Sequence, residues 1–227
     1  MSKNSQGYMG IQIGKLGPAV GRIYRREQVY SAYQPHVRNP RTEAQQANRA
    51  RFRRLMGLTR AFVPATALGL SAAAENAGLH YRNLFTKLNA DAVSTAMEPE
   101  VRYGELVVAL GPAVGVMFSG VAAESGGKVV VAYDANMETP GAGVRDEVYV
   151  FAYGEGLGYG VMSGGVARTV GRVELELPSV WAGERMHVYG FVRTTNRQAE
   201  WDEALGRQRL PFEVSGSVYV GVAVVVE

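Results

Sequence analysis

The six residues RVELEL (172–177) alternate charged and apolar side chains. An extended chain with this pattern has one face in water and one face buried, which is typical of an antiparallel sheet packed on one side. Apolar segments of similar length, separated by turn sequences such as Ser125-Gly126-Gly127, lie on both sides of it. The stretch therefore predicts a strand within a β-rich C-terminal part of the chain.

Seven or eight strands at this spacing predict an antiparallel immunoglobulin-like or fibronectin-like β-sandwich over residues 99–227. Trp181, ahead of the strand sequence HVYGFV, fits the packing of such domains. The expected strands cover residues 105–111, 115–121, 128–134, 147–153, 158–162, 172–177, 186–193 and 217–226.

Residues 41–98 have a helical pattern. Thr42 and Gln45 form a capping box after the Asn39-Pro40 break, so a helix should begin there and end at Pro64. A short second helix is expected over 66–74 and a third over 75–97, where Gly78 weakens the first turns. The fold class is thus α+β, with two or three helices before the sandwich.

Residues 1–40 are glycine-rich and suit an extended β arm. RIYRREQVYSAY (22–33) predicts short strands with a hairpin around Arg25–Gln28. The arm is too short for a core of its own, so its strands should pair with another sheet.

The word LGPAVG occurs at 16–21, inside the arm, and again at 110–115. Gly-Pro should bend the chain in both copies, and Val-Gly should start an extended segment. The first copy would then begin a strand that has no sheet of its own.

Catalytic chemistry has little support in the sequence. The chain has no cysteine, and its three histidines, His36, His80 and His187, stand in unrelated contexts, so no metal or cofactor is expected. His187 should be a surface or edge histidine of a strand. Gly10–Lys15 departs from the phosphate-loop spacing, and there is no Gly-x-Ser-x-Gly. We therefore expect a non-enzymatic protein without catalytic residues.

Charge is unevenly distributed. Residues 1–60 carry twelve basic and two acidic residues, and residues 61–227 carry twelve basic and nineteen acidic ones. Arginine with interleaved tyrosine suits protein interfaces and also phosphate contacts, and the basic segment could equally lie against its own acidic domain. We favour protein–protein assembly, through the candidate interface residues Ile11, Ile13, Val20, Ile23, Tyr24, Arg25, Arg26, Tyr30, Tyr33, Arg38, Arg41, Arg49 and Arg53.

Five stretches of the chain carry a resemblance to known proteins: GKLGPAVGRIYRREQVYSAY (14–33), VRNPRTEAQQANRARF (37–52), NLFTKLNADAV (83–93), VRYGELVVALG (101–111) and VSGSVYVGVAVVV (214–226). The most distinctive part is the pattern N-P-R-T-x-x-Q in the second stretch. Together they resemble an uncharacterised family of Bacteroidota proteins, and the N-terminal part resembles phage-associated structural proteins. The resemblance implies a β-sandwich with an N-terminal extension and helices, a virion or filament component, and no catalytic activity.

The hypothesis that joins these observations is a structural protein that self-assembles head to tail, as a filament, tube or virion-like assembly, when its basic arm adds a strand to a neighbour. One alternative is a nucleic-acid-associated virion protein that uses the Arg-rich segment 22–60. Another is a carbohydrate- or partner-binding sandwich with Trp181 or Trp201 on its binding face. Neither a signal peptide nor a membrane span is recognisable, so we expect synthesis in the cytoplasm and an extracellular filament or virion as the final site.

Overall fold

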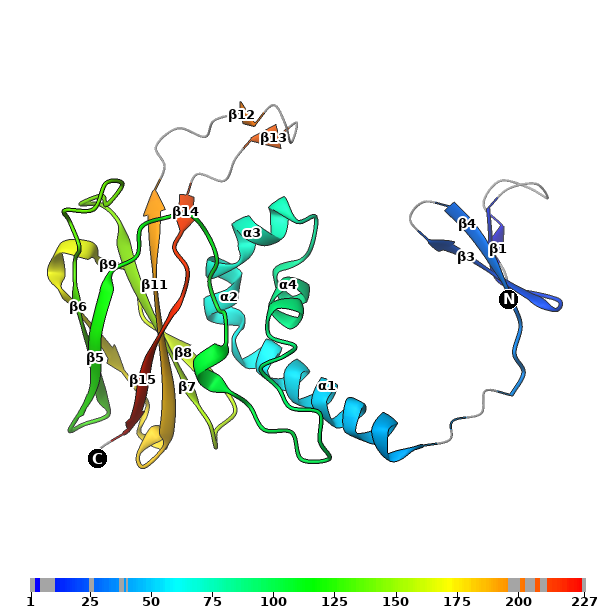
Figure 1. Ribbon diagram of the computed structural model, residues 1–227, viewed down its shortest axis with the longest axis horizontal. Coiled ribbons are helices and arrows are strands. Elements are labelled where there is room, and N and C mark those ends of the chain that lie inside the picture. The colour runs from blue at the N-terminus through cyan, green and yellow to red at the C-terminus, as the bar shows by residue number, and fades with distance from the viewer. Residues whose placement is uncertain are drawn as a thin grey trace. The chain divides into compact units, whose positions relative to one another are not determined.

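The structure is a computed structural model (Figure 1), and it describes residues 3–4, 11–24, 27–36, 39, 41–195, 201–202, 207–208 and 212–225. The chain forms two compact units, Met1–Thr42 and Glu43–Glu227. We call them the N-terminal unit and the body. The protein is a mixed α+β protein, mostly β, with antiparallel sheets and, in the described part, four α-helices, which confirms the expected fold class at this level.

The N-terminal unit is a four-stranded antiparallel sheet in the order β1-β2-β3-β4. The expectation that the strand begun by the first LGPAVG has no sheet of its own was therefore wrong, because that strand, β3, pairs with both β2 and β4. Tyr24 lies opposite Glu27, as the expected hairpin requires. The strands are β1 (Lys3–Asn4), β2 (Gln12–Leu16), β3 (Ala19–Tyr24) and β4 (Glu27–Ala32).

The body begins with α1, which starts one residue after the expected cap Thr42. The chain leaves α1 before Pro64, and this proline lies in the first turn of α2, where its missing N–H costs nothing. The single helix expected over 75–97 is instead split, since Gly78 adopts the left-handed region at φ +64° and His80 caps a new helix. The four helices are α1 (Glu43–Ala61), α2 (Val63–Gly69), α3 (Ser71–Asn76) and α4 (Tyr81–Leu88).

Two antiparallel sheets form the β part of the body. One has the order β10-β6-β5, and the other has the order β14-β11-β7-β8, with β15 also paired to β11 and β9 to β7. The strand expected over 105–111 is absent, because the short 3-10 helix η1 (Tyr103–Glu105) leads into an extended segment outside the ladders. The strands are β5 (Met117–Glu124), β6 (Lys128–Asp134), β7 (Glu147–Gly154), β8 (Gly160–Met162), β9 (Val166–Ala167), β10 (Arg172–Glu176), β11 (Arg185–Thr195), β14 (Phe212–Val214) and β15 (Val218–Val224); a short separate pair is formed by β12 (Trp201–Asp202) and β13 (Arg207–Gln208).

Both faces of the larger sheet are covered. Along β7, Val148 and Val150 pack in one hydrophobic cluster with residues of β6 and β10, whereas Tyr149 and Phe151 pack in a second cluster with the helices. The helices lie over one face of this sheet in Figure 1. A sheet buried on both sides explains why residues 148–153 of β7 and 188–192 of β11 form apolar runs rather than alternating ones. The helical segment and the strands share a core, so residue 98, where the helical segment was expected to end, lies inside one compact unit.

The two LGPAVG copies adopt different structures. In the first, Gly17 has φ +58° and forms the two-residue turn between β2 and β3 with Pro18. The second bends at Pro112 and Ala113 and lies outside the ladders. Gly111 is so close to the Val214 carbonyl that a Cβ would overlap it, and the Ala113 N–H donates to that same carbonyl. The bend expected at Gly-Pro is therefore confirmed in both copies, whereas Val-Gly lies in a strand only in the first.

Candidate functional site

The N-terminal unit exposes most of its apolar side chains. Among its described residues only Gly21 is buried, and a side chain at that position would overlap the carbonyl oxygen of Gln12, so β2 passes directly over it. Val20 is half-buried. Large apolar or aromatic residues are exposed by 37 to 59 %, namely Ile11, Ile13, Ile23, Tyr24, Tyr30 and Tyr33.

Polar contacts hold this sheet in place of a core. Gln28 Nε2 donates to the Gln12 carbonyl at 2.9 Å and to the Tyr30 hydroxyl at 2.7 Å. The Lys15 ammonium lies 3.8 Å from the ring centroid of Tyr33. Three predicted interface residues, Arg25, Arg26 and Arg38, lie outside the described residues.

The structure divides the described part of the arginine cluster into two groups. Arg51 bonds to the Ala90 carbonyl and pairs with Asp91 at 3.2 Å, and Arg54 donates to the Tyr103 hydroxyl at 3.0 Å. These two arginines hold α1 against the rest of the body. Nothing in the sequence distinguishes them from the other arginines of the cluster. Another group is exposed, namely Arg41, Arg49, Arg53 and Arg60.

A buried polar cluster surrounds His187. Its ring stacks on that of Tyr103 with centroids 3.8 Å apart, and its two nitrogens lie 2.9 Å from the Tyr219 hydroxyl and 3.5 Å from a Glu155 carboxylate oxygen. The expectation of a surface or edge histidine was wrong, since His187 is 3 % exposed. It lies on the face of the sheet that η1 and the helices cover. The sequence pattern of a single strand does not show that this face is covered.

Burial lowers the pKa of His187, and Glu155 opposes this only in part. Burial also raises the pKa of Tyr103 to about 12, so this tyrosine is neutral at physiological pH. The imidazole is therefore neutral at physiological pH, stacked on Tyr103 and hydrogen-bonded to Tyr219.

We expect His187 to make the body less stable in acid. Its folded-state pKa lies below the unfolded value of about 6.5, so between the two values the unfolded chain binds more protons and the free energy of unfolding rises with pH. The contribution is complete above about pH 6.5 and is lost as pH falls through that window. Urea unfolding at pH 7.5, 6.0 and 5.0 should show a steeper loss in the native protein than in His187→Gln. Equal slopes would contradict this prediction.

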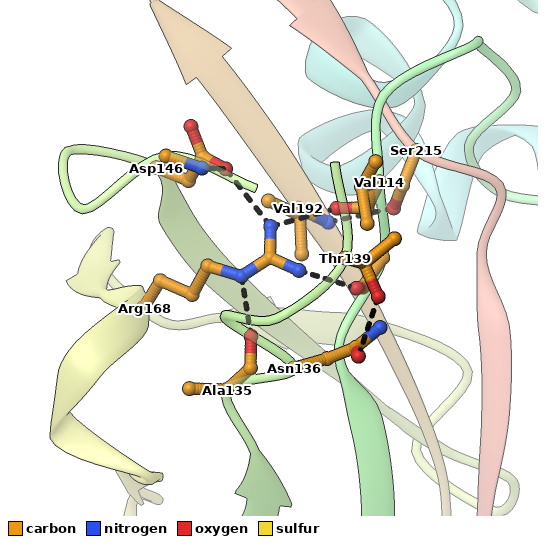
Figure 2. A network of polar contacts seen from close by, with 10 residues as sticks. Val114, Ala135, Asn136, Thr139, Asp146, Arg168, Val192 and Ser215 are labelled. Atoms are coloured by element: carbon orange, nitrogen blue, oxygen red, sulfur yellow. Dashed lines mark hydrogen bonds and ion pairs between the residues drawn. The ribbon is translucent and has the colours of Figure 1, made fainter. Parts of the chain in front are cut away.

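Arg168 forms a second buried polar cluster, which sequence reasoning missed (Figure 2). Its guanidinium is fully buried and pairs with Asp146 at 2.8 Å. It also donates to the carbonyls of Ala135 at 2.6 Å, Val114 at 2.9 Å and Gly115 at 2.6 Å. The last two belong to the second LGPAVG. Nothing in the local sequence RTVGRV marks this arginine as buried.

Other predicted features have these outcomes. Trp181 is fully buried, and its Nε1 donates to the Tyr159 hydroxyl at 2.8 Å, so it cannot lie on a binding face. The side chain of Trp201 lies outside the described residues. Within the described ranges, no three His, Asp or Glu residues are grouped as metal ligands are, and no helix is both long and apolar enough to cross a membrane.

A model of a known protein family matches most of the chain. Residues 11–200 match the model of a family of unknown function, DUF6266, and the chain belongs to this family. The matched range includes β2 to β4 of the N-terminal unit as well as the helices and most strands of the body. A search of curated proteins found no match.

Proposed function

We propose that this member of the DUF6266 family is a non-enzymatic structural protein whose copies assemble head to tail through the N-terminal unit. The observation that carries the proposal is a small sheet with large exposed apolar side chains and, among its described residues, only Gly21 buried. A sheet of this size gains little from its own packing. Covering these side chains on another subunit would supply the missing hydrophobic stabilisation, about 1 kcal/mol for each half-exposed side chain.

Charge supports a partner of the same kind. Residues 1–42 carry seven basic and one acidic residue, a net charge of +6, and residues 43–227 carry seventeen basic and twenty acidic residues, a net charge of −3. The N-terminal unit of one copy and the body of another therefore attract each other. Such a contact joins two different surfaces, so it is heterologous and either closes into a ring or continues as a filament or tube.

Strand addition is the pairing mode that we propose. β4 is an outer strand of the N-terminal unit, and among the described strands its second edge has no ladder partner. The body offers open edges as well, since β5 and β10 are the outer strands of their sheet. Backbone hydrogen bonds between two open edges would give affinity, and the exposed tyrosines would give register.

The test compares assembly of three full-length proteins by light scattering and negative-stain microscopy. Ile23→Lys places a charge on the N-terminal sheet, and Val144→Lys makes the same change at an exposed site of the body; these residues are 48 % and 63 % exposed. The native protein and Val144→Lys should form rings or filaments, and Ile23→Lys should be monomeric with an unchanged unfolding transition. A variant lacking residues 2–42 should also be monomeric. A monomeric native protein, or full assembly of Ile23→Lys, would overturn the proposal.

Two finer assignments belong to this proposal. The first is an immunoglobulin-like sandwich, supported by two facing antiparallel sheets with Trp181 in their shared core, although helices cover the far face of the larger sheet. The second is a virion or extracellular filament as the setting, which rests on the resemblance of residues 14–52 to phage-associated structural proteins.

A further inference from the structure

The outward face of α1 carries positive charge without acidic residues. We call it the α1 face, and it comprises Arg49, Phe52, Arg53, Met56 and Arg60. The only acidic residue in this helix is Glu43, at its first position. Arg51 and Arg54 are engaged with the body. Within the described part of the chain, Arg53 and Arg60 have no ion-pair partner.

Phe52 lies among these arginines and is 58 % exposed. The same helix buries Leu55 and Leu58 against the body, so Phe52 is turned away from the core to which α1 contributes. An open depression around it is lined by Asn48, Arg49, Phe52, Arg53 and Met56. An exposed aromatic ring bordered by guanidinium groups is the arrangement that lets bases stack while cations hold the phosphates.

The length of the α1 face suits a short run of nucleotides. From Arg49 to Arg60 the helix rises by about 16 Å, at about 1.5 Å per residue. A stacked strand advances by about 3.4 Å per nucleotide, so about five nucleotides span this distance. The three arginines and Phe52 can therefore contact one continuous stretch of strand.

Charge limits what can cover this face. The N-terminal unit of another copy, with its net charge of +6, is repelled by it. A polyanion is attracted, and an exposed phenylalanine between the cations favours one that carries flat bases. We propose that the α1 face binds single-stranded nucleic acid, with Arg53, Arg60 and Arg49 on phosphates and Phe52 stacked on a base. This inference does not depend on the assembly proposal.

The experiment measures fluorescence anisotropy of a labelled 20-nucleotide single strand with the full-length protein over a range of salt concentrations. Arg53→Gln with Arg60→Gln should weaken binding at least tenfold and reduce the salt slope by about 1.4, the value for two lost phosphate contacts. The matched control is Arg82→Gln with Arg145→Gln, which removes the same charge from exposed sites outside α1 and should bind almost like the native protein. Equal losses in both double variants would overturn the proposal.

The base-stacking part has its own readout. Phe52→Ala should weaken binding of the single strand about tenfold with an unchanged salt slope, and leave binding of heparin, a polyanion without bases, unaffected. Equal loss for heparin, or no loss for the single strand, would overturn it. No binding at low salt would also overturn the proposal. If the arginine variants instead abolish assembly while nucleic-acid binding is unchanged, the occupant is an acidic protein surface and the proposal is wrong.

Discussion

Arg168→Ala is expected to destabilise the body by about 3–5 kcal/mol, because it leaves Asp146 buried without its cation. The Asp146 side chain is only 7 % exposed and, among the described residues, would keep only the Gly143 N–H as a partner. The carbonyls of Ala135, Val114 and Gly115 would lose their donor at the same time. Val114 and Gly115 come just before β5 in the sequence, and Ala135 comes just after β6. The loss of stability should therefore affect the whole body rather than one loop.

Urea unfolding at neutral pH measures this effect. Arg172→Ala is the matched control, since its side chain is 65 % exposed and pairs with Glu174 at the surface, where an ion pair contributes little. Arg168→Lys keeps the charge but cannot reach all four acceptors, so it should fall between native and alanine variants and remain measurable if Arg168→Ala fails to fold. A loss below about 1 kcal/mol for Arg168→Ala would show that solvent or rearrangement satisfies the buried partners.

Local sequence patterns predicted elements where one face decides the structure. The alternation in 172–177 forms β10 with Val173 and Leu175 buried and its charged residues exposed. The capping pattern at Thr42 likewise located the start of α1. In both cases the signal and its cause lie within a few residues of each other.

Other elements depend on distant partners that no local pattern contains. The same six residues form a hairpin turn and the start of a strand at 16–21, but a bend outside the ladders at 110–115. In the second copy the Ala113 N–H donates to the Val214 carbonyl, and Val114 and Gly115 supply carbonyls to Arg168. His187 is buried because both faces of its sheet are covered. The unbroken apolar run of β7 was the available signal for that burial.

The candidate site was predictable as composition and not as geometry. Exposed apolar side chains in the N-terminal unit agree with a segment too short to bury them, although its strands pair with one another. The sequence could not show which arginines of the cluster are bound to the body. Arg51 pairs with Asp91, 40 residues later, and Arg54 donates to Tyr103, 49 residues later.

Phe62→Ala is expected to cost about 3–5 kcal/mol of unfolding free energy, the range for truncating a buried phenylalanine. Phe62 is fully buried at the junction of α1 and α2, and its ring contacts those of Phe85 on α4 and Phe151 on β7, with centroids 5.5 and 4.9 Å away. The cavity left by the truncation would therefore lie between the helices and the sheet that they cover.

Phe52→Ala removes the same side chain ten residues earlier in α1, where the ring is 58 % exposed, and should change stability by no more than about 0.5 kcal/mol. Paired urea unfolding curves of the two variants measure the difference directly. Similar losses would mean that Phe52 packs against the protein in solution. In that event the α1 face would not be free to receive a nucleic-acid strand, so this control also bears on the binding proposal.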